Sequence, residues 1–585
     1  MRRTFILSIL LLVVLNLFSI PAKRTWTVVK QSDGSVLTLM NSGDEHYHYF
    51  VTTDGFTVLK NSNDNNYYYA NKFGFSETIS SLLAHDPDNR SEAETQFLNT
   101  LSSLKSSAAA AKPIYRKLAA PTTETEPRYS FSGIKKGLII LTQFSDVKFS
   151  EVDLRPTFDS IANYKGYDKG KFKGSVADYF YAQSSGAFDI SFDVVGPVTV
   201  SKPESYYGDN FDGSDIRPNE MVVEACKAAD NSVDYKKYDW EGDGTVNMVY
   251  ILYAGYGENE NAPESTIWPH KWNLLSYDSE NPLVLDGVLI DNYACSNELS
   301  GDGKSSVKNL SGIGTICHEF SHCLELPDMY DAVNNKVFGM KDWDILDYGS
   351  YNDGGFQPAG YTSYEKWWCG WLNPIELVNN QKIDHVGALS DGGQSYVIYN
   401  DNDKNEYYLL ENRQLVNWDA SLPGAGLLVT HVDYSQQDWF DNTLNIDSLH
   451  PRMTLIPADN LRNVYSLAND AYPYGANDSL TTTSIPSANI YNVNTDGSYY
   501  MKKSITNITQ NSDGSVSFNF KNDLLATSID KVLSLESFLN NPATIYDTQG
   551  HVVCITACFT GKENIPSGVY IVKDKNGKSH KYIYK

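Results

Sequence analysis

The stretch SGIGTICHEFSHCLELPD, residues 311–328, decides the fold at the centre of this chain. Within it, His318 and His322 are four residues apart. On a helix such residues lie one above the other, so their imidazoles can bind one tetrahedral Zn²⁺. Glu319 would then lie close to the open position of the metal and could take a proton from bound water. The stretch predicts a zinc-binding helix; the alternative is a helix with two surface histidines.

A catalytic zinc site needs a third protein ligand, and Asp328 is the first candidate. Pro327 cannot continue the helix, so the chain turns just after Leu326. Asp328 then lies ten residues beyond His318, a spacing from which a side chain can reach back to the same ion. Two alternatives stay open. Asp328 is an ordinary turn carboxylate, or the ligand is one of three other acids: Glu325, Asp331 and Asp344.

This spacing resembles the metzincin pattern HExxHxxGxxH/D, with Asp in the last position. Where that pattern has glycine, this chain has Glu325, and a Cβ in a left-handed turn costs roughly 1 kcal/mol. Metzincins place a methionine turn beneath the zinc, and Leu346 takes the methionine position here. A hydrophobic floor is still expected, because both side chains are apolar and similar in volume. Tyr348 would be a phenol able to hydrogen-bond an oxyanion; its alternative is a packed core tyrosine.

The order of motifs along the chain is similar to that of the immune inhibitor A family of secreted zinc metallopeptidases. The matching stretches are GLIIL (137–141), GSVADYF (174–180), VGP (195–197), YDWEGDG (238–244), YAGYG (253–257), WPH (268–270), the stretch at 318–328, YLLENRQ (408–414) and LPGAG (422–426). Ser321 and Glu325 replace glycines of the family pattern, and Leu346 replaces its methionine.

The resemblance implies a zinc-dependent endopeptidase that acts on protein substrates, with Glu319 as general base and acid. It also implies an α+β chain: a zincin or metzincin-like catalytic domain, an N-terminal β-rich prodomain and C-terminal β-sandwich-type domains. The expected divisions are a signal peptide (1–22), prodomain (23–102), linker (103–128), catalytic domain (129–375), β-rich continuation of the peptidase module (376–521) and C-terminal sorting domain (522–585).

The N-terminus has the features of an export signal. Arg2 and Arg3 precede an apolar run, and Ala22 is a small residue suited to a cleavage site. No later stretch contains eighteen consecutive apolar residues, so we expect no transmembrane anchor. The net charge of −25 argues against nucleic acid as a partner, and we interpret it as a source of solubility. Seven cysteines are too few and too sparse for a disulfide scaffold.

A second metal site is predicted at residues 239–247. Oxygen-bearing residues stand at alternate positions there, with two glycines that permit a tight wrap. Such a loop suits Ca²⁺; the alternative is a simple acidic turn. The candidate ligands are Asp239, Glu241, Asp243, Thr245 (through its backbone carbonyl) and Asn247. We interpret His270, His431 and His450 as structural histidines.

The last unit, from about residue 524, contains strand-turn-strand patterns and six lysines after His551. It is similar to the C-terminal domains that direct substrates through type IX secretion, so export to the cell surface or medium and a secretion-machinery partner are expected. A small structural β domain is the alternative.

Two hypotheses for function follow. The first is a secreted zinc endopeptidase made as a precursor, whose N-terminal domain and linker cover the cleft until cleavage near residues 103–128. The second is a catalytically impaired zinc-binding surface adhesin, suggested by Glu325 and Leu346. Glu319 argues against the second, because a purely structural zinc site has no use for it.

Overall fold

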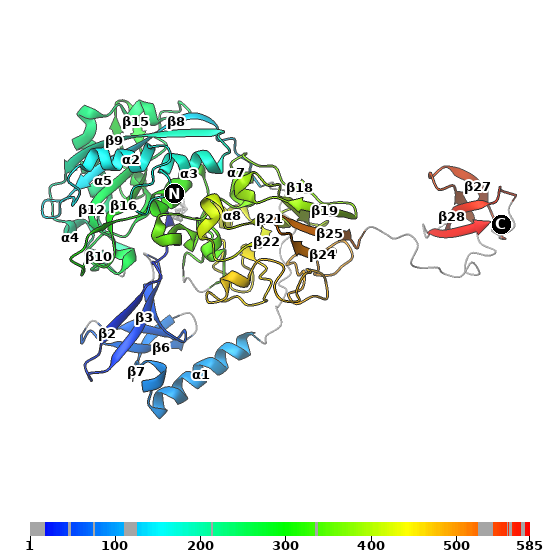
Figure 1. Cartoon of the computed structure of the whole chain (residues 1–585), viewed down its shortest axis with the longest axis horizontal. Coiled ribbons are helices and arrows are strands. Elements are labelled where there is room, and N and C mark those ends of the chain that lie inside the picture. The colour runs from blue at the N-terminus through cyan, green and yellow to red at the C-terminus, as the bar shows by residue number, and fades with distance from the viewer. Residues whose placement is uncertain are drawn as a thin grey trace, which may run out of the picture.

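The structure is a computed structural model. It describes residues 18–44, 48–61, 63–73, 76–109, 126–211, 214–333, 337–524, 542–558, 560, 564–574 and 579–584. The chain forms several β-sheets with helices packed on them (Figure 1), so both element types of the expected α+β class are present. In this part of the chain, no helix is long and apolar enough to cross a membrane.

The helix that carries the HExxH pattern packs on a seven-stranded sheet with the path β1-β13-β16-β12-β8-β9 and β17 paired to β16. Four of its strands, β8, β9, β12 and β16, are parallel. The central strands β8 and β12 contain apolar runs, because both sheet faces are covered there. Strand β13 is antiparallel to β16 and lies near one edge of the sheet. The strands are β1 (Phe18–Ser19), β8 (Gly133–Gln143), β9 (Phe188–Thr199), β12 (Val249–Tyr256), β13 (His270–Asn273), β16 (Asn292–Ser300) and β17 (Asn309–Leu310).

Helices cover both faces of this sheet. On one face, α2 (Leu154–Asn163), α3 (Val176–Gln183) and α6 (Gly314–Ser321) share a hydrophobic core with the strands. On the other face, α5 (Pro218–Ala229) packs in a second core. Helix α3 begins with a capping box between Ser175 and Asp178, as its sequence indicates.

The N-terminal unit is a six-stranded antiparallel sheet in which every strand pairs with the next along the chain. Helix α1 (Glu92–Ala109) packs on it and extends into the stretch assigned to the linker, since Ala and Leu favour helix. Residues 110–125 of that linker lie outside the described residues. The strands are β2 (Trp26–Lys30), β3 (Val36–Gly43), β4 (His48–Thr52), β5 (Thr57–Lys60), β6 (Tyr67–Phe73) and β7 (Ser76–Leu83).

The β-rich part after the catalytic domain contains a five-stranded and a three-stranded sheet around one core. Its five-stranded sheet consists of β18 (Ile375–Glu376), β20 (Tyr396–Tyr399), β21 (Glu406–Arg413), β22 (Gly426–Asp433) and β23 (Met453–Leu455). Its three-stranded sheet consists of β19 (Gln381–Val386), β24 (Lys503–Gln510) and β25 (Val516–Asn522). Two short helices accompany it: α7 (Ser363–Trp368) and α8 (Gln436–Phe440).

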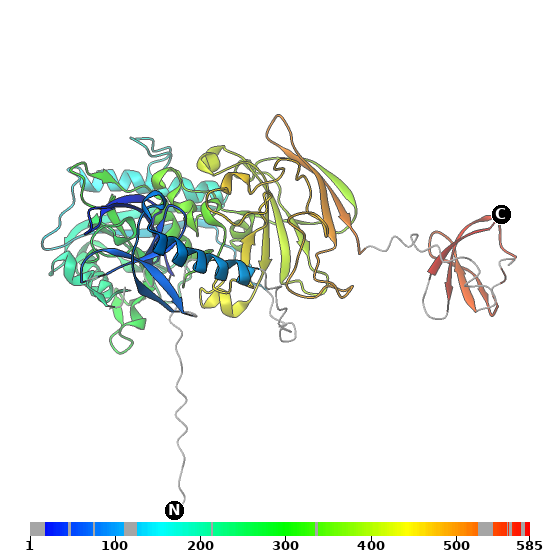
Figure 2. The same ribbon diagram turned by 90° about the horizontal axis from the view of Figure 1, so that it is seen from below.

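The C-terminal unit is a four-stranded sheet with its own small core, drawn in red in Figure 2. Its strands are β26 (Ala543–Tyr546), β27 (Val552–Thr556), β28 (Gly568–Asp574) and β29 (Ser579–Tyr584). The remaining short elements are α4 (Glu204–Tyr207), β10 (Asn210–Phe211), β11 (Ser214–Asp215), β14 (Leu283–Leu285) and β15 (Val288–Ile290).

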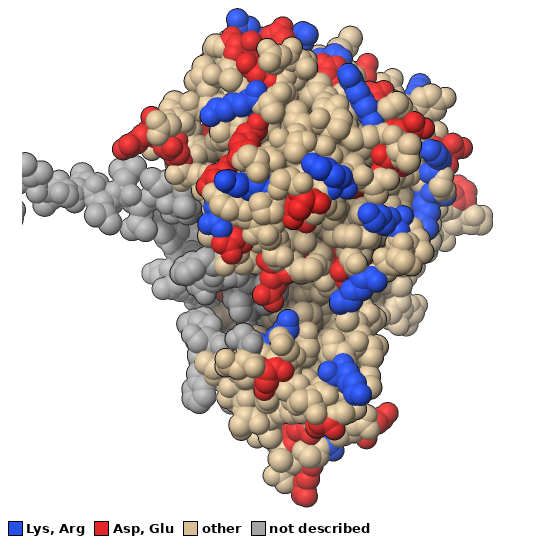
Figure 3. All heavy atoms as spheres, turned by 90° about the vertical axis from the view of Figure 1, so that its left-hand side faces the viewer, with Lys and Arg blue, Asp and Glu red and all other residues tan. Residues whose placement is uncertain are grey.

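The surface charge is mixed. On the face shown in Figure 3, acidic and basic side chains are interspersed without a large patch of one sign. This face therefore agrees with the interpretation of the net charge as a source of solubility.

The histidine that joins the N-terminal sheet to its helix should make this unit sensitive to pH. His85 lies 2.8 Å from Asp33 through Nε2 and 2.8 Å from Glu94, on α1, through Nδ1. Burial alone would lower the pKa of His85, but its hydrogen bonds to Asp33 and Glu94 outweigh burial and raise it. The interaction of charged His85 with its two carboxylate partners therefore stabilises the unit. The stabilisation is fully present below the unfolded pKa of about 6.5 and is lost as pH rises through the higher folded pKa of His85.

We expect hydrogen exchange in β2–β7 to speed up between about pH 6 and pH 8.5 beyond the intrinsic effect of pH. In the variant His85→Gln the side chain does not titrate, so the acceleration of exchange beyond the intrinsic effect of pH should be much smaller. An equal excess in both proteins would contradict the assignment to His85.

Candidate metal centre and cleft

Helix α6, which contains the HExxH pattern, packs closely against the segment that contains Ser350. A Cβ built on Gly314 would lie 1.8 Å from the carbonyl oxygen of Ser350, so only glycine allows this approach. The α-helix ends at Ser321, and His322 begins a 3-10 turn. His318, Glu319 and His322 are all buried, and their ligand atoms lie within 4.8 Å of one another.

Each histidine is oriented by a backbone carbonyl. Nδ1 of His318 lies 2.8 Å from the carbonyl oxygen of Ile345, and Nδ1 of His322 lies 2.7 Å from that of Leu326. A carbonyl can only accept, so both Nδ1 atoms carry the proton and both Nε2 atoms keep a lone pair. Burial and the nearby His318 hold the pKa of His322 well below its ordinary value. His322 is thus held in the neutral form that binds a metal.

Asp328 turns back to the two histidines. Its Oδ1 lies 3.1 Å from Nε2 of His318 and 3.5 Å from Nε2 of His322. Ligand atoms about 2.0–2.1 Å from a tetrahedral zinc are about 3.3 Å from one another, so this spacing fits a single ion. The donor set of two imidazoles and one carboxylate is also one that zinc uses in hydrolases.

Asn442 holds the Asp328 loop in place. Its Oδ1 accepts from the Asp328 backbone N–H at 2.7 Å, and its Nδ2 donates to Asp328 Oδ2 at 2.7 Å. Asn442 follows α8 in the β-rich part and is separated from Asp328 by 114 residues. No local motif marks it, so sequence patterns do not predict its role. Only the pairing of distant segments could have identified it.

The turn at Glu325 is left-handed, as the glycine of the metzincin pattern requires. Glu325 has φ 59° and ψ 23°, and its N–H donates to the His322 carbonyl. The chain therefore keeps the turn and accepts a Cβ in it. The side chain is exposed, which keeps it clear of the packed core.

Leu346, at the position of the expected hydrophobic floor, follows Ile345, whose carbonyl orients His318. Leu346 is fully buried, and its carbonyl accepts from the Met329 N–H at 2.8 Å. Tyr348 follows on the 3-10 segment Tyr348–Gly355 and is also buried. The guanidinium of Arg24 lies 3.3 Å from the centre of its ring.

Two of the competing carboxylates have other partners. Asp331 accepts from the backbone N–H groups of Val333 and Val337. Asp344 accepts from the Leu346 N–H at 2.8 Å, and burial raises its pKa to about 6. Glu325 lies in the turn itself. Of the four candidate acids, the structure places Asp328 against both histidines.

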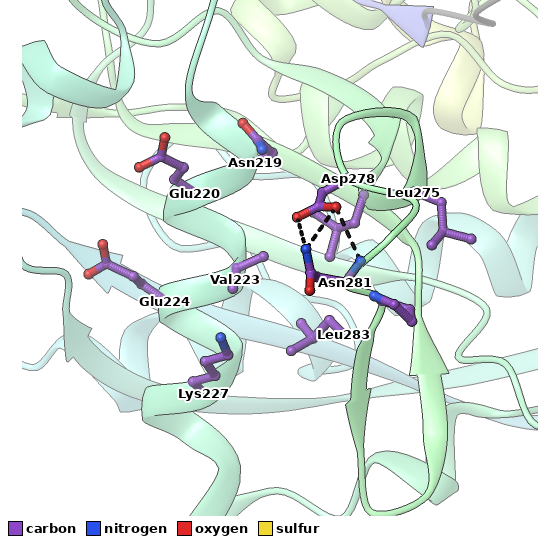
Figure 4. Close-up of a pocket in the computed structure, with 11 residues that line it drawn as sticks. Asn219, Glu220, Val223, Glu224, Lys227, Leu275, Asp278, Asn281 and Leu283 are labelled. Carbon is purple, nitrogen blue, oxygen red and sulfur yellow. Dashed lines mark hydrogen bonds between the residues drawn. The ribbon is translucent and has the colours of Figure 1, made fainter. Parts of the chain in front are cut away.

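A cavity of about 720 Å³ opens beside His322. Its wall combines Lys271 and Glu325 with aromatic rings, including Tyr129, Trp368 and Trp439. Such a mixture of apolar surface and a few charges is typical of a site that binds an organic ligand or a peptide side chain. A cavity of about 350 Å³ lies elsewhere, between α5 and the segment before β14, and contains no predicted site residue (Figure 4).

The predicted calcium loop lines the same cavity, but its side-chain oxygens accept hydrogen bonds from other groups of the loop. Asp239 accepts from the N–H groups of Gly242, Asp243 and Gly244. Glu241 accepts from Asn247 Nδ2, and Asp243 accepts from the Thr245 N–H. These contacts are those of an acidic turn, so calcium binding stays a prediction. The three candidate histidines all have polar partners: His270 contacts Tyr293, His431 contacts Glu406 and His450 contacts Asp433.

The comparisons with known proteins agree with this centre. Residues 157–371 match the family model described as immune inhibitor A peptidase M6, catalytic domain. The pre-pro-metalloprotease PrtV of Vibrio cholerae serotype O1 (strain M66-2) is 28% identical over 255 residues, which are 38% of this chain and 27% of the relative.

A second relative is immune inhibitor A of Bacillus thuringiensis subsp. alesti, 22% identical over 322 residues, which are 47% of this chain and 46% of the relative. The matches cover at most 46% of the length of these relatives. Over these residues the chain is therefore similar to a peptidase family and to a relative named as a metalloprotease.

Replacing Glu325 by glycine should stabilise the protein. Glycine adopts φ near 60° without the Cβ penalty of roughly 1 kcal/mol. Glu325→Ala is the matched control, because it removes the carboxylate but keeps the Cβ. Thermal unfolding should therefore give a higher Tm for Glu325→Gly than for Glu325→Ala. A lower Tm for the glycine variant would show that the turn is not strained.

Proposed function

We propose that the chain is a zinc-dependent endopeptidase made as a precursor. The observation that carries the proposal is the convergence of His318, His322 and Asp328 at spacings that suit one ion, with Glu319 beside them. These three residues would hold the metal. A bound zinc would polarise the scissile carbonyl and lower the pKa of its water.

Glu319 would do the proton chemistry. Its carboxylate is fully buried in the residue cluster of the metal centre. It would take a proton from the attacking water and deliver it to the nitrogen of the leaving amine. Tyr348 would donate its phenolic hydrogen to the developing oxyanion. In the precursor Arg24 lies over the ring of Tyr348, so this phenol would become available only when Arg24 leaves.

The N-terminal part supports the precursor assignment. Residues 20–25, here called the inserted segment, lie between β1 and the N-terminal sheet and contact the catalytic domain. Ile20 and Ala22 are fully buried. We propose that this segment, together with the sheet, covers the cleft until the precursor is cleaved. The expected signal-peptide cut after Ala22 would remove the first half of these contacts.

The remaining assignments are predictions from the sequence. The C-terminal unit would direct export through an outer membrane, and the loop at 239–247 would bind calcium. The adhesin alternative receives no support from the domain match or from the relatives.

Substituting Glu319→Gln tests the proposed function. Loss of the base should lower kcat on an unfolded protein substrate by about a hundredfold or more. Metal analysis should still find zinc bound, because Glu319 is not a proposed ligand. Glu280→Gln, at an exposed site, is the matched control and should keep full activity. An unchanged rate for Glu319→Gln would rule out this mechanism, and no chelator-sensitive hydrolysis by the processed wild-type chain would rule out the enzyme.

The contact between Asn442 and Asp328 predicts a specific loss of metal affinity. Removing a group that positions a ligand typically lowers metal affinity 10–100-fold. We therefore expect Asn442→Ala to weaken zinc binding by about that factor in competition with a chelator. Asn442→Asp should weaken it as well, because a carboxylate replaces the amide donor to Asp328 Oδ2.

The neighbouring Asn445→Ala is the matched control. Asn445 is buried and donates to the carbonyls of Met329 and Met453 but is not hydrogen-bonded to Asp328. It should lower the free energy of unfolding without a comparable loss of zinc affinity. Equal zinc affinities in the Asn442 variants and the wild type would show that Asp328 needs no support, or is not a ligand.

A further inference from the structure

The inserted segment lies in the catalytic domain as an extended peptide. Strand β1, directly before it, pairs antiparallel with β13. Three backbone groups of the segment are then hydrogen-bonded to the catalytic domain. The Ile20 carbonyl accepts from Trp268 Nε1 at 2.9 Å, the Pro21 carbonyl accepts from the Tyr351 hydroxyl at 2.6 Å, and the Lys23 N–H donates to the Asn259 carbonyl at 2.8 Å. Any extended chain could make such contacts.

This path passes the metal centre. Phe18 of β1 is the register partner of Lys271, and Lys271 lines the same cavity as His322. At the other end of the path, Arg24 lies against Tyr348, three residues after Ile345, whose carbonyl orients His318. The segment therefore follows residues that adjoin the candidate metal centre, and under the proposed function a peptide substrate would take the same path.

The side chain of Lys23 enters an acidic site. Its Nζ lies 2.9 Å from Glu260 Oε2 and 3.1 Å from Ser300 Oγ. The Glu260 side chain is only 8% exposed, and it also accepts from Ser300 Oγ and the Gly301 N–H. Glu260 is thus fixed before a cation arrives. A buried carboxylate held in this way binds a positive charge with little loss of its own freedom.

The side chain of Arg24 enters a second acidic site. Its guanidinium stacks on Tyr348 and donates to Asp342 Oδ2 at 3.1 Å. Buried Asp347 adds negative charge nearby, while Lys341 lies 5.4 Å from the same ring and offsets part of it. Cation–π stacking and a carboxylate are the two interactions that favour arginine over a neutral side chain.

We infer that the two acidic sites are side-chain subsites of the cleft, and that its substrates are extended segments with two adjacent basic residues. The inference rests on the proposed peptidase function. Adjacent side chains of an extended chain point in opposite directions, so Lys23 and Arg24 reach different walls. A basic segment would also be drawn to a chain whose net charge is −25.

Peptide binding to an inactive full chain tests the inference. The protein is the full chain with Glu319→Gln, and with Lys23→Ala and Arg24→Ala to weaken its own segment. The probes are a labelled peptide IPAKRTW, the sequence of residues 20–26, and its twin IPAAATW. Fluorescence anisotropy should give a Kd for the basic peptide about tenfold or more below that of the twin. Equal binding, or no binding of the basic peptide, would overturn the inference.

The acidic residues are then tested in the same background. Adding Glu260→Gln and Asp342→Asn should reduce the preference to about twofold or less. Asp342→Asn alone should remove part of the preference for the basic peptide. Because Asp342 is partly exposed, this substitution carries less risk to folding than a substitution of the buried Glu260. Asp159→Asn, at an exposed position on α2, is the matched control and should keep the preference. A preference that survives the double substitution would also overturn the inference.

Hydrogen exchange in the otherwise native chain gives a second measurement. The Lys23 amide should exchange faster when Glu260→Gln and Asp342→Asn are introduced, because both anchors of the segment are weakened. An unchanged rate counts against the two sites. Neither measurement requires turnover. If the zinc-loaded, processed chain cleaves no peptide while the binding preference stands, the peptidase proposal fails and the two basic-residue sites remain.

Discussion

The hydrogen bonds between Asn442 and Asp328 connect the metal centre to the β-rich half of the chain. A second connection is buried Arg413 on β21, which bonds Asp419 and Glu411 and also the carbonyls of Trp343 and Gly360. The loop that carries Asp328 and the floor beneath the histidines are therefore both held from outside the residues that match the peptidase family, which end at 371. The β-rich part therefore contributes contacts that hold the candidate metal centre in place.

Local patterns in the sequence predicted the elements that depend on local physics. The spacing of His318 and His322 predicted a shared ligand face. The glycine position taken by Glu325 identified the turn, which is left-handed as the family pattern requires. Composition was a weaker guide: the Ala- and Ser-rich stretch assigned to a linker begins as the last turns of α1, because alanine favours helix as readily as it occurs in linkers.

Long-range contacts could not be predicted, because no local pattern encodes them. Asn442 is 114 residues from Asp328, and Lys23 is 237 residues from Glu260. Each pair meets only because the whole fold brings distant segments together. The loop at 239–247 shows the reverse problem. Its oxygens have the spacing of a cation site, yet backbone N–H groups of the loop itself can take the same acceptors.

The short pairing of β1 with β13 has a consequence for the processed protein. Once β1 is gone, one side of β13 becomes the open edge of the seven-stranded sheet, with unpaired N–H and carbonyl groups. Such an edge can pair with a segment that adopts an extended conformation, but not with a helix or with a strand that is already paired on both sides. The folded bodies of target proteins would resist attack, while their loops and tails would be cut. The same exposed edge could pair with that of a second processed molecule. Solubility at high concentration would therefore depend on the fraction of molecules whose edge is occupied by a bound peptide.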